Sequence, residues 1–363
     1  MPLADLLKEG ERIMTICNAC RYCEGHCAVF PAMELRTSFP EPDLTYLANL
    51  CHGCGSCFHH CQYAPPHPFA VNVPKTFAEL RVETYKAFAW PRFLARAFDR
   101  NALVTALVTA ASLAFLFVIA GNGGGLGSRH LGSGAFYAVV SHTAMVTLFG
   151  AVSLAVIGAL GVGLARFWRH TSDRPARPVD WLRGLWDALR LRYLDGGGGG
   201  CTYPQEAPSR SRRWLHHLTF YGFALCFAST TVAAVYDNLL GWQAPYPVTS
   251  LPVLLGTAGG IGLLAGPSGL FLLKLRSDPA PNPRGGSFTM DVAFLAMLFL
   301  TSATGLLLLV FRATVAMGIL LGIHLGFVLA LFLTIPYGKF VHAVYRYGAL
   351  VHYAMESRQC KDR

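Results

Sequence analysis

The stretch that decides the fold reads Cys17-Asn-Ala-Cys20-Arg-Tyr-Cys23-Glu-Gly-His-Cys27 and then Cys51-His-Gly-Cys54-Gly-Ser-Cys57-Phe-His-His-Cys61. In both runs the cysteines are separated by two, two and three residues, which is the spacing of thiolates that hold a [4Fe–4S] cluster. In proteins with two such runs, the fourth cysteine of each run ligates the other cluster. The pattern therefore predicts one cluster on Cys17, Cys20, Cys23 and Cys61, and a second on Cys51, Cys54, Cys57 and Cys27.

Zinc is the alternative metal for such cysteines. Zinc sites use pairs of cysteines two residues apart, whereas each run here is complete for a cluster, so we favour iron–sulfur clusters. Neither Cys27 nor Cys61 is followed by proline, unlike the run of small bacterial ferredoxins; Ala28 and Gln62 stand there instead. Helical segments around the runs favour an α-helical ferredoxin-like domain.

The rest of the chain has the composition of a membrane protein. Of its 363 residues, 53% are hydrophobic and only 14% are charged, whereas about 25% are charged in a soluble domain. Long apolar blocks predict six membrane-spanning helices, so we expect a mainly α protein with a six-helix transmembrane bundle like that of b-type cytochromes. The expected spans are residues 102–120, 135–165, 214–236, 250–273, 289–311 and 315–343.

This organisation divides the chain into four parts. Residues 1–74 form the soluble two-cluster domain, and residues 75–100 form an amphipathic linker that lies on the membrane interface. The membrane domain covers residues 101–345, including a cytoplasmic loop over 166–213, and residues 346–363 form a cytoplasmic tail. In that loop, residues 181–193 predict an amphipathic helix on the inner leaflet or a docking surface for a partner, and Gly196–Gly200 reads as a flexible connector.

The net charge of +10 follows from topology and not from nucleic-acid binding. Arginines gather before the first span and in the 166–213 loop, whereas the loop 237–249 contains no Lys or Arg. The positive-inside rule places both termini and the cluster domain in the cytoplasm of a multi-pass inner-membrane protein.

Histidines inside the expected spans are candidate haem ligands. His324 and His342 are eighteen residues apart, which is five helical turns, so one helix places them on the same face about 27 Å apart. Near the inner leaflet, His216 or His217 can meet His342; near the outer leaflet, His142 can meet His324. This geometry predicts one or two b haems with two histidine ligands each, and the alternative is a set of hydrogen-bonded core histidines. Three cations are candidates to neutralise the inner haem propionates: Lys339, Arg213 and Arg346.

Two more charged residues lie in or near the fifth span. Asp291 and Arg312 are candidates for a quinone site, where they would take up protons or fix a carbonyl group. A buried salt bridge or an arginine that reaches the interface explains the same residues.

Two resemblances narrow the function. His324, Ile335-Pro336-Tyr337, Lys339 and His342 resemble the haem-carrying gamma subunit family of nitrate reductase, and the run from Arg213 through His216 to Phe223 is similar to its early ligand helix, which favours His216. That family's second ligand on this helix has no counterpart here, since Cys226 and Phe227 stand near its place. With the double cysteine domain included, nearly the whole chain resembles the family of tricarballylate and citrate utilisation B proteins.

The second resemblance implies an electron-transfer subunit beside an FAD-dependent, tricarballylate dehydrogenase-like partner. Its reduced flavin would pass electrons through the two clusters and b haem to membrane quinone. A related fused form acts in cobalamin synthesis, which leaves the partner open. The chain has no flavin or nucleotide fingerprint of its own, so we expect the substrate chemistry in the partner. The alternatives are a quinone-coupled reductase with an intramembrane substrate site, and a cluster-bearing anchor or redox sensor without haem.

Overall fold

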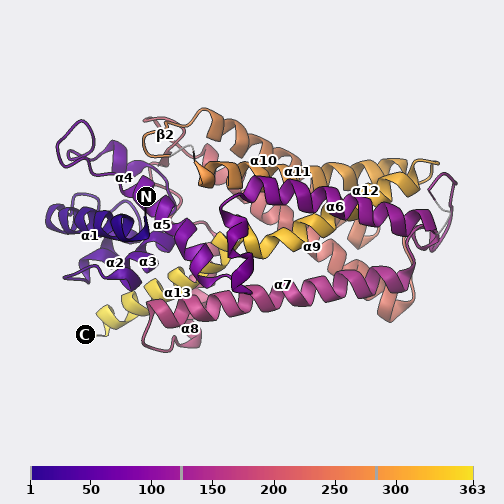
Figure 1. The fold of residues 1–363 in the computed structure, drawn as a ribbon, viewed down its shortest axis with the longest axis horizontal. Coiled ribbons are helices and arrows are strands. Elements are labelled where there is room, and N and C mark those ends of the chain that lie inside the picture. Colours follow the sequence, from indigo (N-terminus) through magenta and orange to yellow (C-terminus); the bar gives the residue numbers. More distant parts are fainter. Residues whose placement is uncertain (1, 123–125, 283–284, 363) are drawn as a thin grey trace.

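The chain folds into a small helical domain and a long helical bundle that lie end to end (Figure 1). The computed structural model describes residues 2–122, 126–282 and 285–362, so Met1 and Arg363 at the ends of the predicted ranges lie outside the described residues. Both described chain ends lie at the end of the molecule formed by the small domain. The predicted mainly α fold is confirmed, with one two-stranded pairing among the described residues.

The small domain contains the cysteine runs. Its helices are α1 (Leu3–Cys20), α2 (Val29–Glu34), α3 (Glu41–Leu50), α4 (Ser56–His59) and α5 (Val73–Phe88). Arg21 adopts a left-handed conformation with φ 55°, which ends α1 in the middle of the first cysteine run. Fully buried side chains from four helices form the core of this domain, among them Ile13, Phe30, Tyr46 and Phe77.

The segment expected as an interfacial linker is divided between two structural roles. The side chain of Asn72 caps α5 by accepting a hydrogen bond from the backbone N–H of Lys75. Phe77, Leu80 and Tyr85 of α5 are buried in the core of the small domain. Only the following 3₁₀ helix η1 (Arg92–Phe98) keeps the interfacial character, with Phe93 74% exposed.

Six helices are long and apolar enough to cross a membrane, which confirms the predicted multi-pass bundle. They are α6 (Asn101–Asn122), α7 (His142–Thr171), α9 (Ser211–Leu240), α10 (Leu251–Leu275), α11 (Gly286–Phe311) and α12 (Met317–Thr334). The second span starts later than expected because Ser141 caps α7 through its side chain, after a short 3₁₀ turn η2 (Ala135–Ala138). Glycines allow α9 and α10 to approach closely: a Cβ on Gly259 would lie 2.7 Å from the carbonyl oxygen of Gly222.

The sixth predicted span is not one helix. α12 ends at Thr334, a 3₁₀ turn η3 (Ile335–Tyr337) contains Pro336, Gly338 is extended, and α13 (Val341–Lys361) then begins. Proline cannot donate a backbone hydrogen bond, and its ring crowds the preceding turn. His324 and His342 therefore lie on two different helices, and the expectation that one helix carries both was wrong.

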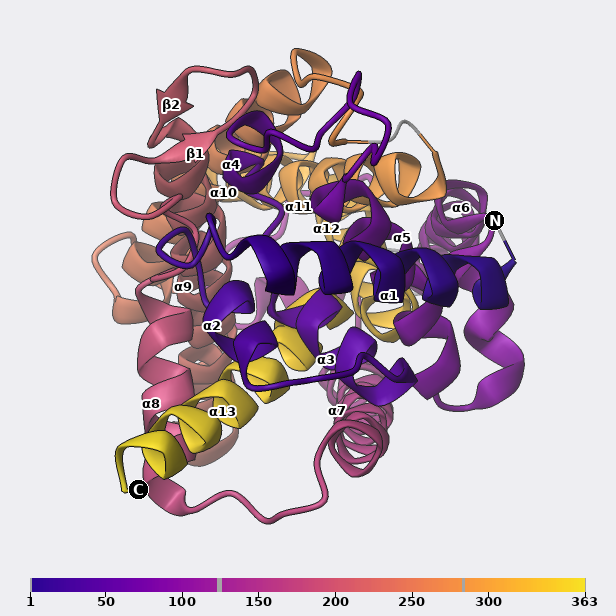
Figure 2. The same cartoon turned by 90° about the vertical axis from the view of Figure 1, so that its left-hand side faces the viewer.

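The segment expected as a tail is the greater part of α13, which runs beneath the small domain (Figure 2). Glu356 near its end accepts hydrogen bonds from Arg36 at 2.6 Å and from the hydroxyl of Tyr46 at 2.9 Å. On the other side of α13, Arg358 forms a bidentate salt bridge with the carboxylate of Asp180 on α8 (Pro178–Leu189), and both N–O distances are 2.9 Å. These contacts fix the small domain on the bundle.

Helix α8 is the predicted amphipathic helix of the long loop. It packs against α13, where a Cβ on Gly184 would lie 2.8 Å from the side chain of Val351. Leu182 and Trp186 are more than half exposed. This apolar outer face is compatible with both predicted roles, on the leaflet or against a partner.

Candidate cysteine cages and histidine pair

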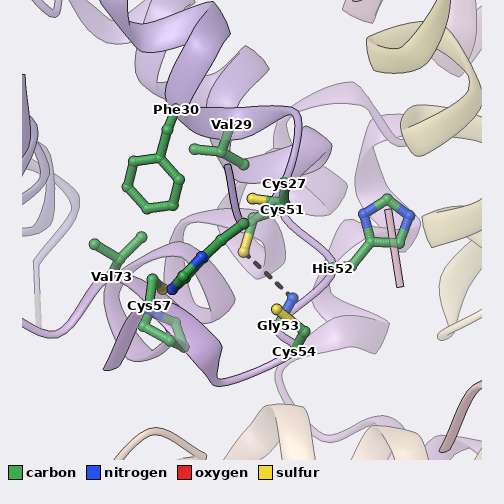
Figure 3. Close-up of a pocket in the computed structure, with 11 residues that line it drawn as sticks. Cys27, Val29, Phe30, Cys51, His52, Gly53, Cys54, Cys57 and Val73 are labelled. Carbon is green, nitrogen blue, oxygen red and sulfur yellow. Dashed lines mark hydrogen bonds between the residues drawn. The ribbon is translucent and has the colours of Figure 1, made fainter. Parts of the chain in front are cut away.

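Four cysteines from both runs line one cavity in the small domain. Cys27 from the first run joins Cys51, Cys54 and Cys57 from the second run around this pocket. Figure 3 shows their sulfur atoms gathered on the same side of the loops. We call this group cage II. Its composition is the crossed set predicted from the spacing of the two runs.

The other four cysteines gather beside it. The pKa of Cys17 is raised to about 12, first by burial and then by the neighbouring thiols of Cys23, Cys61 and Cys20. Cys61 of the second run therefore lies with three cysteines of the first run, and we call this group cage I. Cys23 connects the two cages, because its pKa is raised by burial, by Cys61 and Cys20, and also by Cys54 of cage II.

The donor set fits iron–sulfur clusters. Burial and crowding raise the pKa values of Cys27 and Cys57 well above the ordinary value, so four bare thiolates in each cage would repel one another strongly. Iron cations remove this repulsion and keep the ligands deprotonated. No described group of three or more His, Cys, Asp or Glu residues is arranged around a single metal ion. In a [4Fe–4S] cluster each thiolate binds its own iron, so the four sulfurs need not converge on one point.

Cage II is covered by a loop that is distant in sequence. Cys201, which seemed isolated in the sequence, is buried in one small cluster with Cys54 and Tyr203. The neighbouring thiol of Cys201 is the main reason why the pKa of Cys54 is lowered, and this contact raises the pKa of Cys201 in turn. Cys201 lies in β1 (Cys201–Thr202), which pairs with β2 (Pro208–Ser209).

The glycine run before β1 is part of this cover, and its interpretation as a flexible connector was wrong. Four of its five glycines have positive φ, a conformation that favours glycine. A Cβ on Gly197 would lie 2.9 Å from the carbonyl oxygen of Gly25, and one on Gly196 would lie 2.5 Å from the hydroxyl of Ser56. The run therefore packs against the cysteine loops of both cages, which only residues without a side chain permit.

The membrane histidines form one close pair at the end of the bundle next to cage II. His216 lies in the second turn of α9 and His342 in the first turn of α13, and their ring centroids are 6.2 Å apart with an interplanar angle of 77°. With metal–nitrogen bonds of about 2.0 Å and ring nitrogens about 1.1 Å from each centroid, two imidazoles on one iron have centroids about 6.2 Å apart. This spacing would allow both rings to bind one metal ion placed between them.

The nitrogen atoms of the pair support this role. Nδ1 of His342 lies 2.6 Å from the carbonyl oxygen of Lys339, so Nδ1 donates and Nε2 is left with a free lone pair. Nδ1 of His216 is buried without a hydrogen-bond partner. His217 points elsewhere: its ring stacks on Tyr221 at 5.7 Å. The structure therefore favours His216 as the partner of His342.

Arginines join this pair to cage II. Arg212, one turn before His216, donates to the carbonyl oxygens of His52 and Gly53. Arg346, one turn after His342, donates to the carbonyl oxygen of Cys51 at 2.6 Å. His52 lies among these groups: its pKa is well below the ordinary value, mainly because of burial, then Arg346, with His216 and Arg212 also contributing.

The outer histidines are not brought together as predicted. Nε2 of His142 lies 2.6 Å from the carboxylate of Asp237, and Asp237 also accepts a hydrogen bond from Tyr137 at 2.7 Å. Nδ1 of His324 lies 3.1 Å from the carbonyl oxygen of Thr301. His142 has this nearby carboxylate as its partner, so the predicted pairing with His324 is replaced by two separate polar contacts.

The remaining charged candidates also have protein partners. Asp291 lies between Lys274 at 2.6 Å and Lys339 at 2.7 Å, which is the salt-bridge alternative to a quinone site. Arg312 donates to the carbonyl oxygen of Tyr246. Of the proposed propionate partners, Lys339 is held by Asp291 and Arg213 by Asp195 at 3.1 Å.

Comparisons with known proteins agree with this architecture. Residues 96–362 match a family described as citrate utilization protein B, and residues 10–87 match the citrate utilization protein B Fer4-like domain. The chain is 49% identical over 361 residues to citrate utilization protein B of Escherichia coli, an alignment that covers 98% of this chain and 93% of that relative. No solved structure matches the chain.

Proposed function

The chain belongs to the citrate utilization protein B family, and from that premise we propose that it is an electron-transfer protein of the cell inner membrane. It takes electrons from the reduced FAD of a tricarballylate dehydrogenase-like partner on the cytoplasmic face. It passes them through two [4Fe–4S] clusters and one b haem to membrane quinone. The family and its Fer4-like domain support the iron–sulfur electron-transfer role, and the haem, the partner and the quinone are our proposals.

The observation that carries the haem proposal is the 6.2 Å approach of the His216 and His342 rings beside cage II. A haem with two histidine ligands requires two imidazoles at the distance that one iron can bridge. It also favours a ring whose Nδ1 is fixed by a carbonyl group, as in His342. His216 and His342 would hold the haem iron. Cage I and cage II would each hold one [4Fe–4S] cluster.

These groups suit a flavin donor. Reduced flavin releases two electrons, whereas iron–sulfur clusters and b haem each carry one electron at a time. The protein supplies binding, burial and hydrogen bonds to the ligand sulfurs, such as the one from the backbone N–H of Gly53 to Sγ of Cys51 at 3.3 Å. Such bonds set the reduction potential of a cluster.

The cytoplasmic placement of the small domain rests on charge. Arginines gather at the end of the bundle that carries the cysteine cages, including Arg166 at the end of α7 and Arg213 at the start of α9. By the positive-inside rule this end faces the cytoplasm, where a soluble flavoprotein can reach it. Quinone would bind within the bundle, which is in contact with lipid.

A spectrum of the purified full chain tests the proposal. After reduction with dithionite without oxygen, we expect the sharp α-band of a b haem, and we expect a soluble quinone analogue to reoxidise both the haem and the clusters. Iron–sulfur absorbance without an α-band would contradict the haem relay and favour the haem-free anchor or redox sensor. A haem that quinone does not reoxidise would contradict quinone as the acceptor.

A further inference from the structure

Three consecutive backbone carbonyls of cage II are held by arginines. The carbonyl oxygen of Cys51 accepts from Arg346 at 2.6 Å and from Arg81 at 3.1 Å. The next two carbonyl oxygens, of His52 and Gly53, accept from Arg212, the first at 3.3 Å. A guanidinium group has a planar fork that can bind two acceptors at once, which fixes the backbone segment in one position.

Two of these arginines belong to the helices that carry the histidine pair. Arg212 precedes His216 by four residues on α9, and Arg346 follows His342 by four residues on α13. Residues four apart lie on the same helix face, about 6 Å apart along the axis. Because the two helices run in opposite directions at this point, each arginine lies on the side of its histidine that faces cage II.

The segment between them is buried. His52 is 7% exposed and Cys51 is 6% exposed. Figure 3 shows the ring of His52 directed away from the cage II sulfurs, so the segment presents a cysteine to one side and an imidazole to the other. A buried, hydrogen-bonded segment of this kind gives a short and rigid path between two redox groups.

Cage I has a different environment. Its four cysteines are partly exposed, and Tyr22 within its run is 66% exposed. None of the described hydrogen bonds joins the backbone of its cysteines to α9 or α13, in contrast to cage II. Cage I therefore faces solvent and a docking donor, and cage II faces the membrane bundle.

We propose that the Cys51–Gly53 segment is the bridge through which cage II passes electrons to the His216–His342 pair, and that Arg212 and Arg346 are its positioning residues. This inference rests on the proposed function. In each event one electron moves: the group held by cage II is oxidised, the group held by the histidine pair is reduced, and no bond forms or breaks. The positive charge of the three arginines favours the reduced, more negative state of cage II, which directs electrons from cage I to cage II.

Electron paramagnetic resonance of the purified full chain tests which cage lies next to the haem. A paramagnetic ferric haem accelerates the spin relaxation of a nearby reduced cluster. In protein that is frozen rapidly after mixing with reductant, while its clusters are reduced and its haem is still ferric, we expect one fast-relaxing and one slow-relaxing cluster signal. The Cys57→Ser variant of cage II should lose the fast signal, and the Cys20→Ser variant of cage I should lose the slow one. The reverse assignment would overturn the proposal.

A matched pair of arginine variants tests the bridge without touching a ligand. Arg212→Gln removes the contacts to His52 and Gly53 together with the stacking of Arg212 over the Tyr203 ring, whereas Arg213→Gln removes contacts to Asp195 and Arg190. Both variants should keep the iron and haem content of the wild-type protein. In Arg212→Gln, the midpoint potential of the fast-relaxing cluster should fall and that cluster should lose most of its relaxation enhancement. Arg213→Gln should change neither quantity. Arg212→Lys keeps the positive charge but lacks the planar guanidinium group that binds two carbonyl oxygens at once. It should therefore restore the midpoint potential of the cluster more than its relaxation enhancement.

A failure of the bridge and a failure of the proposed function give different results. Equal behaviour of the Arg212→Gln and Arg213→Gln variants in a haem-containing protein would overturn the bridge and leave the proposed function intact. Absence of the haem α-band in the wild-type protein would overturn the relay itself, and that result comes from the optical spectrum before any variant is made.

Discussion

The thiol of Cys201 lies against Cys54 of cage II, although the two residues are far apart in the sequence. Hydrogen bonds to ligand sulfurs make a cluster easier to reduce, because they stabilise its added negative charge. Cys201→Ala should therefore lower the midpoint potential of the cage II cluster, and Cys201→Ser, which keeps a donor, should restore most of it. Redox titration followed by electron paramagnetic resonance measures both. An unchanged potential in Cys201→Ala would show that this contact does not tune the cluster.

The cover over cage II depends on a glycine that no other residue can replace. Gly55 has φ 81°, and a Cβ there would lie 2.5 Å from the carbonyl oxygen of Thr202. We expect Gly55→Ala to displace the loop and lose the cage II cluster, so that non-haem iron falls from about eight to about four per chain. Gly25→Ala is the matched control, because no atom lies within 4 Å of its added Cβ. Full iron content in Gly55→Ala would count against this packing.

The contact between α13 and the small domain should weaken in acid. Burial, and after it the charge of Arg36, lowers the pKa of His352 from 6.5 to about 4. A group whose folded pKa is depressed binds its proton more readily when the contact opens, so stability is full above pH 6.5 and falls as the pH drops towards 4. At pH 5 the loss is about 2 kcal/mol. The titratable groups that face His352 are Glu356, Arg36, Asp43, Asp173 and the hydroxyl of Tyr46.

Hydrogen exchange of α13 between pH 7.5 and 5 measures this effect. The wild-type protein should lose protection over residues 349–360 as the pH falls, and His352→Gln, which cannot be protonated, should show a flatter profile. Protection that does not depend on pH in the wild-type protein would contradict the assignment to His352.

The contact of His142 with the carboxylate of Asp237 bears on the number of haems. Because Nε2 of His142 is engaged by this carboxylate, we expect His142→Ala to retain the haem content of the wild-type protein, whereas Asp237→Asn should change the local contacts only. The haem-to-protein ratio by pyridine haemochrome measures this. Loss of haem in His142→Ala would restore the predicted outer site.

The sequence predicted the features that depend on local spacing. The spacing of the two cysteine runs predicts crossed sets, and the four cysteines of one set line one pocket; that both sets hold clusters stays a prediction. The six spans follow from the length of the apolar blocks. His216 and His342 were paired by their expected depth in the membrane, and their ring centroids do lie 6.2 Å apart; their role as haem ligands stays a prediction.

Long-range contacts could not be predicted in this way. Nothing local to Cys201 or Gly197 shows that this loop folds over the cysteine loops. The apolar pattern continues past Pro336 and Gly338, so it did not show that the helix ends there. The spacing of Arg212 and Arg346, each four residues from His216 and His342, is the one signal for the bridge that the sequence carries.

Iron and haem content of the purified protein tests the central claim most directly, with His342→Ala beside its neighbour control His217→Ala. The wild-type chain should contain about one b haem and about eight non-haem irons. His342→Ala should lose the haem and keep the non-haem iron, and His217→Ala should keep both. A wild-type chain without haem, or a His342→Ala variant that retains it, would contradict a haem held by His216 and His342.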